Sequence, residues 1–189
     1  MLLLTIGLIL FLAIHSVSII GEGWRDQMVE KLGEWPWKGL YAVVSILGFV
    51  LLVKGYALAR QDPTLLYASP VWLRHGAIVL LLPVFPLILS AYLPGRIQAA
   101  AGHPMLVATQ IWAFAHLLAN GMLADVMLFG SLLAWAAIDQ RSLSRRTART
   151  IPMAPRSAAN DAIAIIAGLG LYAGFLFGIH SWLIGVPIF

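Results

Sequence analysis

The 189-residue sequence contains no cysteine, and this absence excludes several kinds of site. Without cysteine the chain forms no disulfide, offers no thiolate to a metal, and lacks the C-x-x-C-H motif that attaches c-type haem covalently. Any haem that this protein binds must therefore be held noncovalently.

Charged residues are scarce, at 11% of the chain, whereas 61% of the residues are hydrophobic and the mean hydropathy is +0.90. This composition is too apolar for a soluble domain of this length. Because about 20 apolar residues cross a bilayer as a helix, the chain has room for about six crossings and little else. The sequence predicts a single integral membrane domain over residues 1–189, an all-α polytopic helical bundle.

Common catalytic motifs are also missing. The sequence contains no Walker loop, dinucleotide-binding fingerprint, nucleophile elbow or HExxH motif, so nucleotide hydrolysis and zincin chemistry have no local support. The net charge of +4 does not indicate nucleic acid, because the basic residues lack interleaved aromatics and lie mainly in loops between apolar segments. This distribution is typical of membrane orientation.

Six apolar segments can be drawn, over about 2–20, 39–59, 73–93, 105–120, 122–139 and 161–183. The first lacks the basic start and the small-residue cleavage site of a signal peptide, so we expect it to be a retained helix. The stretch GEGWRDQMVEKLGEWPWKG after it has Trp24, Met28 and Leu32 at helical spacing. It predicts a short amphipathic helix in the membrane interface, with boundary anchors at Trp35, Pro36 and Trp37.

Two segments contain residues that affect helix geometry. Pro83 and Pro86 predict a kink in the third segment, where neighbouring groups must satisfy the freed carbonyls. In the sixth, Gly170, Gly174 and Gly178 recur every four residues on one face. They predict close packing against another helix, with a smooth floor for a flat ligand as the alternative.

The distribution of Lys and Arg predicts the orientation. With six crossings and the N-terminus outside, nine basic residues fall on the cytoplasmic side and three outside, which favours an inner-membrane protein with both termini periplasmic. The nine are Arg25, Lys31, Lys38, Arg96, Arg141, Arg145, Arg146, Arg149 and Arg156, and the three are Lys54, Arg60 and Arg74.

Histidines inside apolar segments are candidates for function, because polar groups in a bilayer are costly unless satisfied. His75 and His180 lie near segment ends and can reach interfacial water, and His103 precedes Pro104, where we expect it to cap a helix. His15 and His116 lie well inside their segments, and helical rise places them within about 10 Å of each other in depth.

His103 and His116 lie about 220° apart around a straight helix, so a metal bound by His116 needs its second ligand from another helix. By depth, His15 is the best-placed candidate. Two neutral imidazoles suit bis-histidine ligation of haem iron but not zinc, which usually takes three or four protein ligands. Spacing alone leaves a second interpretation open, in which both are simply buried and hydrogen-bonded.

Other polar residues lie near His116. Trp112, His116 and Asn120 are four residues apart and would form one stripe on a helix. Asp125 lies near the start of the next segment, where we expect it to pair with Asn120 or a backbone amide, favoured by the helix N-terminus. A proton relay through Asp125 is the alternative.

The stretch HPMLVATQIWAFAHLLANGMLADVMLFGSLLAWAAIDQRS, together with IHS in the first segment, resembles the NnrU family of bacterial membrane proteins over nearly the whole chain. The HP pair, the W-x-x-x-H-x-x-x-N-G block and the following LFG carry the resemblance. It implies a link to denitrification and nitric oxide or nitrite metabolism, and a domain shared with the plant 15-cis-zeta-carotene isomerase, a haem b enzyme. It also implies a haem b held by His15 and His116. We expect Trp112 and Asn120 to shape that pocket and orient the imidazole, as groups around metal ligands commonly do.

A second resemblance is to the RHP-x-Y-x-G stretch of membrane methyltransferases of the isoprenylcysteine carboxyl methyltransferase type. Here Gly102, Leu106 and Ala108 replace the arginine, tyrosine and glycine, and the later acidic pair is reduced to Asp139. A methyltransferase relative using S-adenosylmethionine therefore stays as an alternative. A cofactor-free helper for assembly of a respiratory complex is a third.

The first resemblance leads us to expect a bis-histidine haem b protein in lipid, and we expect no nucleic-acid partner. A six-coordinate haem can pass electrons, bind a small gas such as nitric oxide, or act on a hydrophobic polyene in isomerase-like chemistry. Electron transfer would require a redox or respiratory-complex partner. The sequence does not choose among them.

Overall fold

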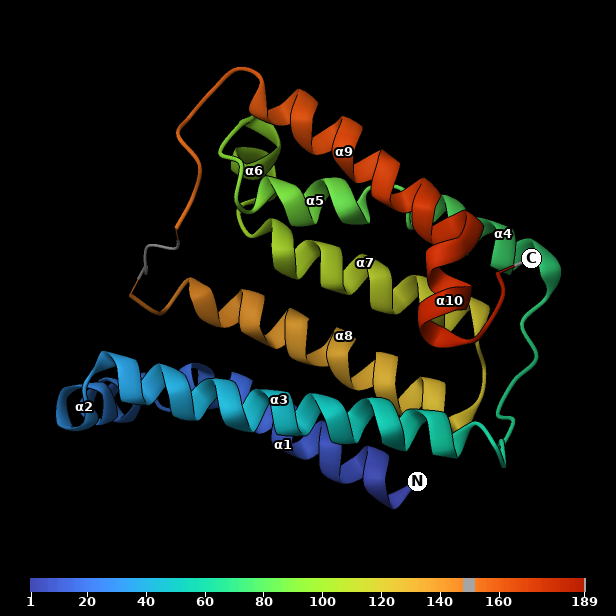
Figure 1. The fold of residues 1–189 in the computed structure, drawn as a ribbon, viewed down its shortest axis with the longest axis horizontal. Helices are drawn as coiled ribbons and strands as arrows, with labels where there is room; N and C mark the ends of the chain where they lie inside the picture. Colours follow the sequence, from blue (N-terminus) through green and yellow to red (C-terminus); the bar gives the residue numbers. More distant parts are fainter. Residues whose placement is uncertain (148–151, 189) are drawn as a thin grey trace. The chain divides into compact units, whose positions relative to one another are not determined.

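The computed structural model describes residues 1–147 and 152–188, is 77% helical, and has no strands in these ranges (Figure 1). Contacts divide the chain into two compact units. Unit 1 comprises Met1–Ala68 and Asn120–Thr147, and unit 2 comprises Ser69–Ala119 and the described residues 152–188. Each unit combines segments that are distant in sequence. The single membrane domain expected from composition stays a prediction.

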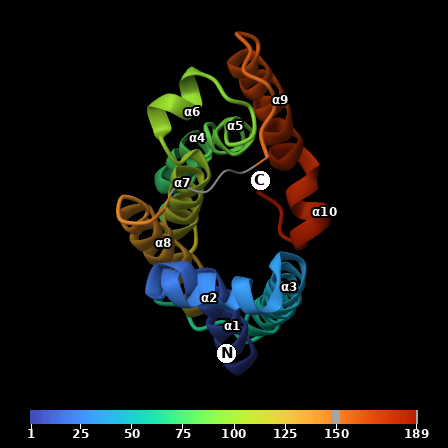
Figure 2. The same ribbon diagram turned by 90° about the vertical axis from the view of Figure 1, so that its left-hand side faces the viewer.

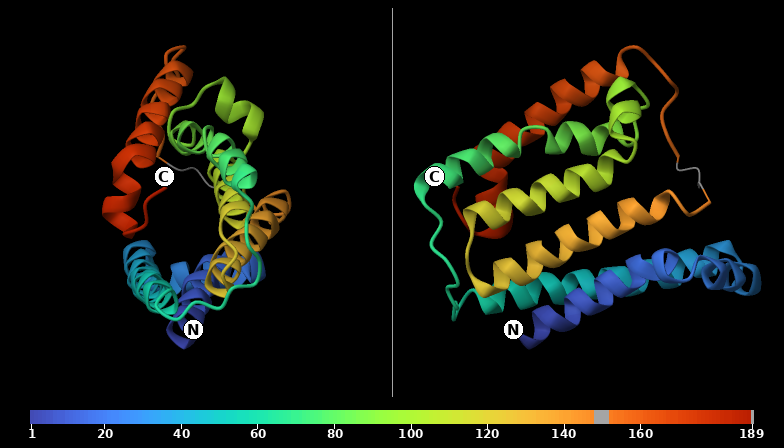
Figure 3. Two further views of the ribbon diagram at one scale, coloured as in Figure 1. Left: turned by 90° about the vertical axis from the view of Figure 1, so that its right-hand side faces the viewer. Right: turned by 180° about the vertical axis from the view of Figure 1, so that it is seen from behind.

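Unit 1 contains four helices: α1 (Leu2–Ile20), α2 (Glu22–Leu32), α3 (Glu34–Ala59) and α8 (Leu123–Leu143). Helices α1 and α3 lie side by side and antiparallel (Figure 3). A Cβ added at Gly7 would lie 2.3 Å from the Leu52 nitrogen, and one added at Gly55 would lie 2.2 Å from the Leu4 nitrogen. Glycines let two helix backbones approach this closely, so they set the spacing of the pair.

Helix α2 confirms the helix predicted between the first two segments, and none of its residues is buried. Its position at a membrane surface stays a prediction. The expected anchors Trp35, Pro36 and Trp37 lie in the first turn of α3, which begins at Glu34. The helix can include Pro36 because proline is tolerated in a first turn. Trp35 is exposed, whereas Trp37 is buried with its ring centroid 6.0 Å from that of Trp24.

Unit 2 contains seven shorter elements in its described residues. Helix α5 lies between α7 and α9 (Figure 2). The elements are α4 (Val71–Leu80), α5 (Val84–Ser90), α6 (Arg96–Ala101), α7 (Pro104–Ala119), α9 (Asn160–Gly174), the π-helical turn η1 (Phe175–Ile179) and α10 (His180–Ile184).

The break between α4 and α5 confirms the predicted kink at the prolines. Because Leu82 donates its backbone N–H to the Val79 carbonyl, the carbonyl of Ile78 has lost its usual helical partner. The Tyr172 hydroxyl, from α9, donates to the Ile78 carbonyl at 2.8 Å. A neighbouring helix therefore satisfies the freed carbonyl, as the sequence led us to expect.

The predicted packing of the glycine stripe in the last segment is wrong. A Cβ at Gly170 or Gly178 would meet nothing within 4 Å among the described residues, and one at Gly174 would meet only the side chain of Ile179. The close approach occurs at Gly168, where a Cβ would lie 2.4 Å from the Pro86 nitrogen. Helix α9 thus packs on α5 through a different face from the one that carries this stripe.

Among the described residues, five helical stretches are long and apolar enough to cross a membrane: Leu2–Ile20, Glu34–Ala59, Val71–Ser90, Leu123–Leu143 and Asn160–Ile184. The protein thus has the helices of a multi-pass membrane protein. Helix α7, which contains His116, is apolar but has only 16 residues. The sixth crossing stays a prediction.

Candidate functional site

His15 lies in α1 with its Nδ1 atom 2.6 Å from the Phe11 carbonyl oxygen, one helical turn earlier. A carbonyl oxygen only accepts, so Nδ1 carries the proton and donates it. In a neutral imidazole, Nε2 is then the nitrogen with the lone pair, which is the one that can bind a metal.

Aromatic rings from three helices of unit 1 surround His15. The imidazole centroid lies 4.2 Å from the Phe11 ring, 5.4 Å from the Tyr41 ring and 6.0 Å from the Trp135 ring, which stands perpendicular to it at 88°. Tyr41 belongs to α3 and Trp135 to α8, whereas Phe11 and His15 share α1. The imidazole is thus held in a mainly apolar, aromatic environment.

Three buried polar atoms in unit 1 have no hydrogen-bond partner among the described residues: the indole Nε1 of Trp135, the hydroxyl of Ser45, one turn after Tyr41, and the Nε of Arg146. Leaving such a group unsatisfied costs about 1–3 kcal/mol, so native proteins have few of them. Here one of the three belongs to the indole ring of Trp135, which contacts His15. The indole N–H of Trp135, beside His15, is therefore a hydrogen-bond donor with no acceptor among the described residues.

His116 has the same local geometry in unit 2. Its Nδ1 atom lies 2.8 Å from the Trp112 carbonyl oxygen, and its ring centroid lies 5.0 Å from that of Trp112. Nδ1 therefore donates and Nε2 has the lone pair. Trp112 orients the imidazole through its backbone carbonyl as well as by ring contact.

Asn120 lies outside the helix that carries His116, because α7 ends at Ala119. Its backbone carbonyl accepts a hydrogen bond from the Tyr67 hydroxyl at 2.7 Å. Burial raises the pKa of Tyr67, and the negative charge of Asp125 adds to this, so the phenol stays a donor at neutral pH. The role predicted for the Asn120 side chain stays a prediction.

The structure brings together some of the predicted site residues. Trp112 contacts His116 in unit 2, whereas His15 and Asn120 belong to unit 1. Sequence reasoning missed all three rings around His15. Phe11 could have been found, because it lies four residues before His15 on the same helix face. Tyr41 and Trp135 come from other helices, and no spacing rule connects them to His15.

The other histidines lie near helix ends or on an exposed surface. His103 immediately precedes α7, and its carbonyl accepts the N–H groups of Leu106 and Val107, which confirms the predicted helix start. His180 places Nδ1 2.8 Å from the Val186 carbonyl oxygen, and His75 is exposed on α4. Within residues 1–147 and 152–188, no group of three or more His, Cys, Asp or Glu side chains could hold a metal ion.

Asp125 is fully buried at the first turn of α8. One carboxylate oxygen accepts from the Tyr56 hydroxyl at 2.5 Å, and the other accepts from the Met122 backbone N–H at 3.0 Å. Arg60 lies 3.9 Å from the carboxylate and donates to the Tyr56 hydroxyl at 3.2 Å. The predicted backbone partner is confirmed, whereas sequence reasoning missed the two side-chain partners, Tyr56 in α3 and Arg60 directly after that helix.

Together, these features define an all-helical protein of the multi-pass membrane type, with a histidine oriented by a helix carbonyl in each unit. Residues 3–188 match the model of the family described as NnrU protein, so the chain belongs to this family. Comparisons with curated proteins and with solved structures gave no match.

Proposed function

We propose that this protein binds haem b, with His15 and His116 as the two axial ligands of the iron. One observation carries the proposal: each Nδ1–H donates to the carbonyl four residues earlier, so each Nε2 has the lone pair that iron needs. Metal-binding histidines are commonly oriented in this way by a hydrogen bond from the other ring nitrogen.

The residues around His15 fit a porphyrin. Phe11, Tyr41 and Trp135 offer apolar aromatic surface, which suits a flat macrocycle. The unpartnered Trp135 Nε1 atom is a hydrogen-bond donor available to a polar edge group of such a ligand. The chain has no cysteine, so the attachment is noncovalent, and the b type is what the resemblance to the NnrU family implies.

When bound, the haem would supply one-electron transfer or reversible binding of a small gas such as nitric oxide. The chain's own residues would hold the two imidazoles and fix their tautomers through the Phe11 and Trp112 carbonyls, and aromatic rings would supply apolar surface beside His15. The membership of the NnrU family favours a role in denitrification and nitric oxide or nitrite metabolism. We place this activity in the bacterial inner membrane.

The absorption spectrum of the detergent-purified protein from haem-supplied cells tests this proposal. We expect a Soret band that is lost in His15→Ala and in His116→Ala. The matched control is His180→Ala, because His180 makes the same kind of Nδ1 hydrogen bond but lies at the start of α10. This control should keep the band.

Two results would contradict the proposal. A colourless wild-type protein would show that it binds no haem and would favour the methyltransferase or assembly-helper alternatives. Titration with S-adenosylmethionine then separates these two. A coloured protein that bleaches in His103→Ala but not in His15→Ala would show that the ligands are wrongly assigned. Circular dichroism of each variant shows whether loss of colour reflects loss of the helices.

A further inference from the structure

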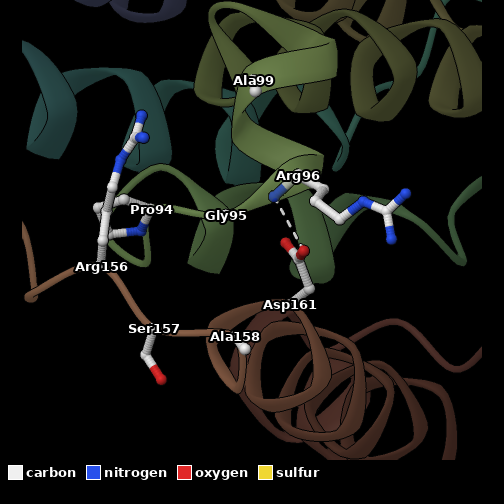
Figure 4. Close-up of a pocket in the computed structure, with 8 residues that line it drawn as sticks. All are labelled: Pro94, Gly95, Arg96, Ala99, Arg156, Ser157, Ala158 and Asp161. Carbon is white, nitrogen blue, oxygen red and sulfur yellow. Dashed lines mark hydrogen bonds between the residues drawn. The ribbon is translucent and has the colours of Figure 1, made fainter.

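We propose that a pocket in unit 2 binds the phosphate group of an anionic ligand. The pocket has a volume of about 570 Å³ and lies between two segments, one around Arg96 at the start of α6 and the other from Arg156 to the start of α9 (Figure 4). Neither segment contains a residue of the proposed haem site. The proposal therefore stands independently of haem binding.

Hydrogen bonds from two residues at the start of α9 hold the two walls together. Asn160 is buried, and its side-chain amide donates to the carbonyls of Pro94 at 2.8 Å and Pro155 at 3.1 Å. The Asp161 carboxylate accepts the backbone N–H groups of Arg96 at 2.8 Å and Ile97 at 3.1 Å. The pocket is thus formed by the chain itself, which lowers the cost of ordering it around a ligand.

The charge of the pocket favours an anion. Arg96 and Arg156 are exposed residues on opposite walls, and their guanidinium groups point away from each other in this structure (Figure 4). Neither guanidinium forms an ion pair with a carboxylate in the part of the chain that the structure describes. The one carboxylate in the pocket, that of Asp161, is already bonded to two backbone amides. Two guanidinium groups on long, adjustable side chains are well suited to phosphate oxygens.

The position of the pocket along the chain indicates where the phosphate comes from. Its two segments directly follow the candidate span Val71–Ser90 and directly precede the candidate span Asn160–Ile184. The ends of membrane-crossing helices lie at the depth of the lipid headgroups, and basic pockets there bind anionic headgroups. A lipid phosphate and a free phosphate share the same chemistry, so the experiment must separate them.

Thermal unfolding of the full-length protein in detergent provides the test. We expect phosphatidylglycerol to raise the midpoint and phosphatidylcholine to leave it unchanged. In the double variant Arg96→Gln, Arg156→Gln, the affinity for phosphatidylglycerol should fall about 30-fold, because each basic contact at a membrane surface contributes about one kcal/mol. The double variant with lysine at both positions should retain most of the binding.

Arg74→Gln is the matched control, because Arg74 is exposed on α4 of unit 2 but does not line the pocket. It should bind like the wild type. Stabilisation by inorganic phosphate, but not by sodium chloride of equal ionic strength, would support the site with a soluble phosphate as its ligand. Equal stabilisation of the wild type and the double glutamine variant by phosphatidylglycerol, or no response to either phosphate source, would overturn the proposal.

Discussion

At the scale of single residues, Asp125 illustrates how a buried charge is tolerated in an apolar protein. Its carboxylate receives hydrogen bonds from a phenol and a backbone amide and lies near a guanidinium. These partners offset the free-energy cost of burying the carboxylate. Removing one member of such a network destabilises the protein, because the remaining charged and polar groups stay buried without their partner. The network therefore joins the end of α3 to the start of α8.

We predict that Asp125→Asn lowers the unfolding free energy by about 1–3 kcal/mol, because Tyr56 and Arg60 lose a charged acceptor. Tyr56→Phe should cost about 1–2 kcal/mol, since it removes the hydrogen bond donated to Asp125 and the one accepted from Arg60 but leaves the Arg60 charge beside Asp125. Unfolding midpoints in detergent measure both. A double-mutant cycle should show strong coupling between the two positions, and purely additive effects would refute the network.

The sequence identified residues of the site where the relevant contact is local. Both imidazole orientations arise from a carbonyl four residues earlier, so helical spacing alone placed Trp112 beside His116. The same rule did not extend to Asn120, because α7 ends one residue before it. Tyr41, Trp135 and the partners of Asp125 come from other helices and depend on tertiary packing, which one sequence does not specify.

At the scale of helices, close packing in this protein depends on particular glycines. The sequence correctly predicted the break at Pro83, because proline acts on its own helix. It selected the wrong glycines in α9, because periodicity shows which residues share a face but not which face meets a neighbour. Close approaches occur where Gly168 of α9 meets α5. They also occur where Gly7 of α1 meets α3 and where Gly55 of α3 meets α1.

We predict that Gly7→Val strongly destabilises unit 1. The new Cβ would lie 2.3 Å from the Leu52 nitrogen and 2.7 Å from its Cα, and backbone atoms cannot rotate aside as a side chain can. Overpacking of this kind costs about 1–3 kcal/mol or more and would displace the helix that carries His15. The thermal midpoint should fall, and any Soret band should weaken with it.

Gly39→Val is the matched control for this prediction. Gly39 also lies in a unit 1 helix, but a Cβ there would meet nothing within 4 Å among the described residues. Its thermal midpoint should stay close to that of the wild type. Equal midpoints for the two valine variants would show that the α1–α3 contact does not set stability.

At the scale of the whole molecule, the number of membrane crossings depends on whether α7 crosses the membrane. Its 16 residues span about 24 Å, somewhat less than a bilayer core of about 30 Å. If α7 crosses, the chain has six crossings and both termini lie on one side. If it does not, the five candidate spans put the termini on opposite sides.

With the N-terminus outside, the basic residues favour six crossings over five. Four of the arginines expected inside follow or end α8, at Arg141, Arg145, Arg146 and Arg156, and a fifth, Arg149, lies outside the described residues. With five crossings and the N-terminus outside, α8 would end on the periplasmic side and expose this cluster there, against the positive-inside rule. The proposed haem site also needs α7 at membrane depth, since it carries His116.

Reporter fusions test this prediction. Alkaline phosphatase, which is active only in the periplasm, should be active when fused to the C-terminus and inactive when fused after Leu143. A green fluorescent protein that fluoresces only in the cytoplasm should give the opposite pattern. A fusion after Ala68 should lie outside if the N-terminus is outside, which separates both of these topologies from five crossings with the N-terminus inside. Phosphatase activity after Leu143 together with fluorescence at the C-terminus would show five crossings. In that topology α7 would not cross the membrane core, and His116 would not be placed to act as the second ligand with His15.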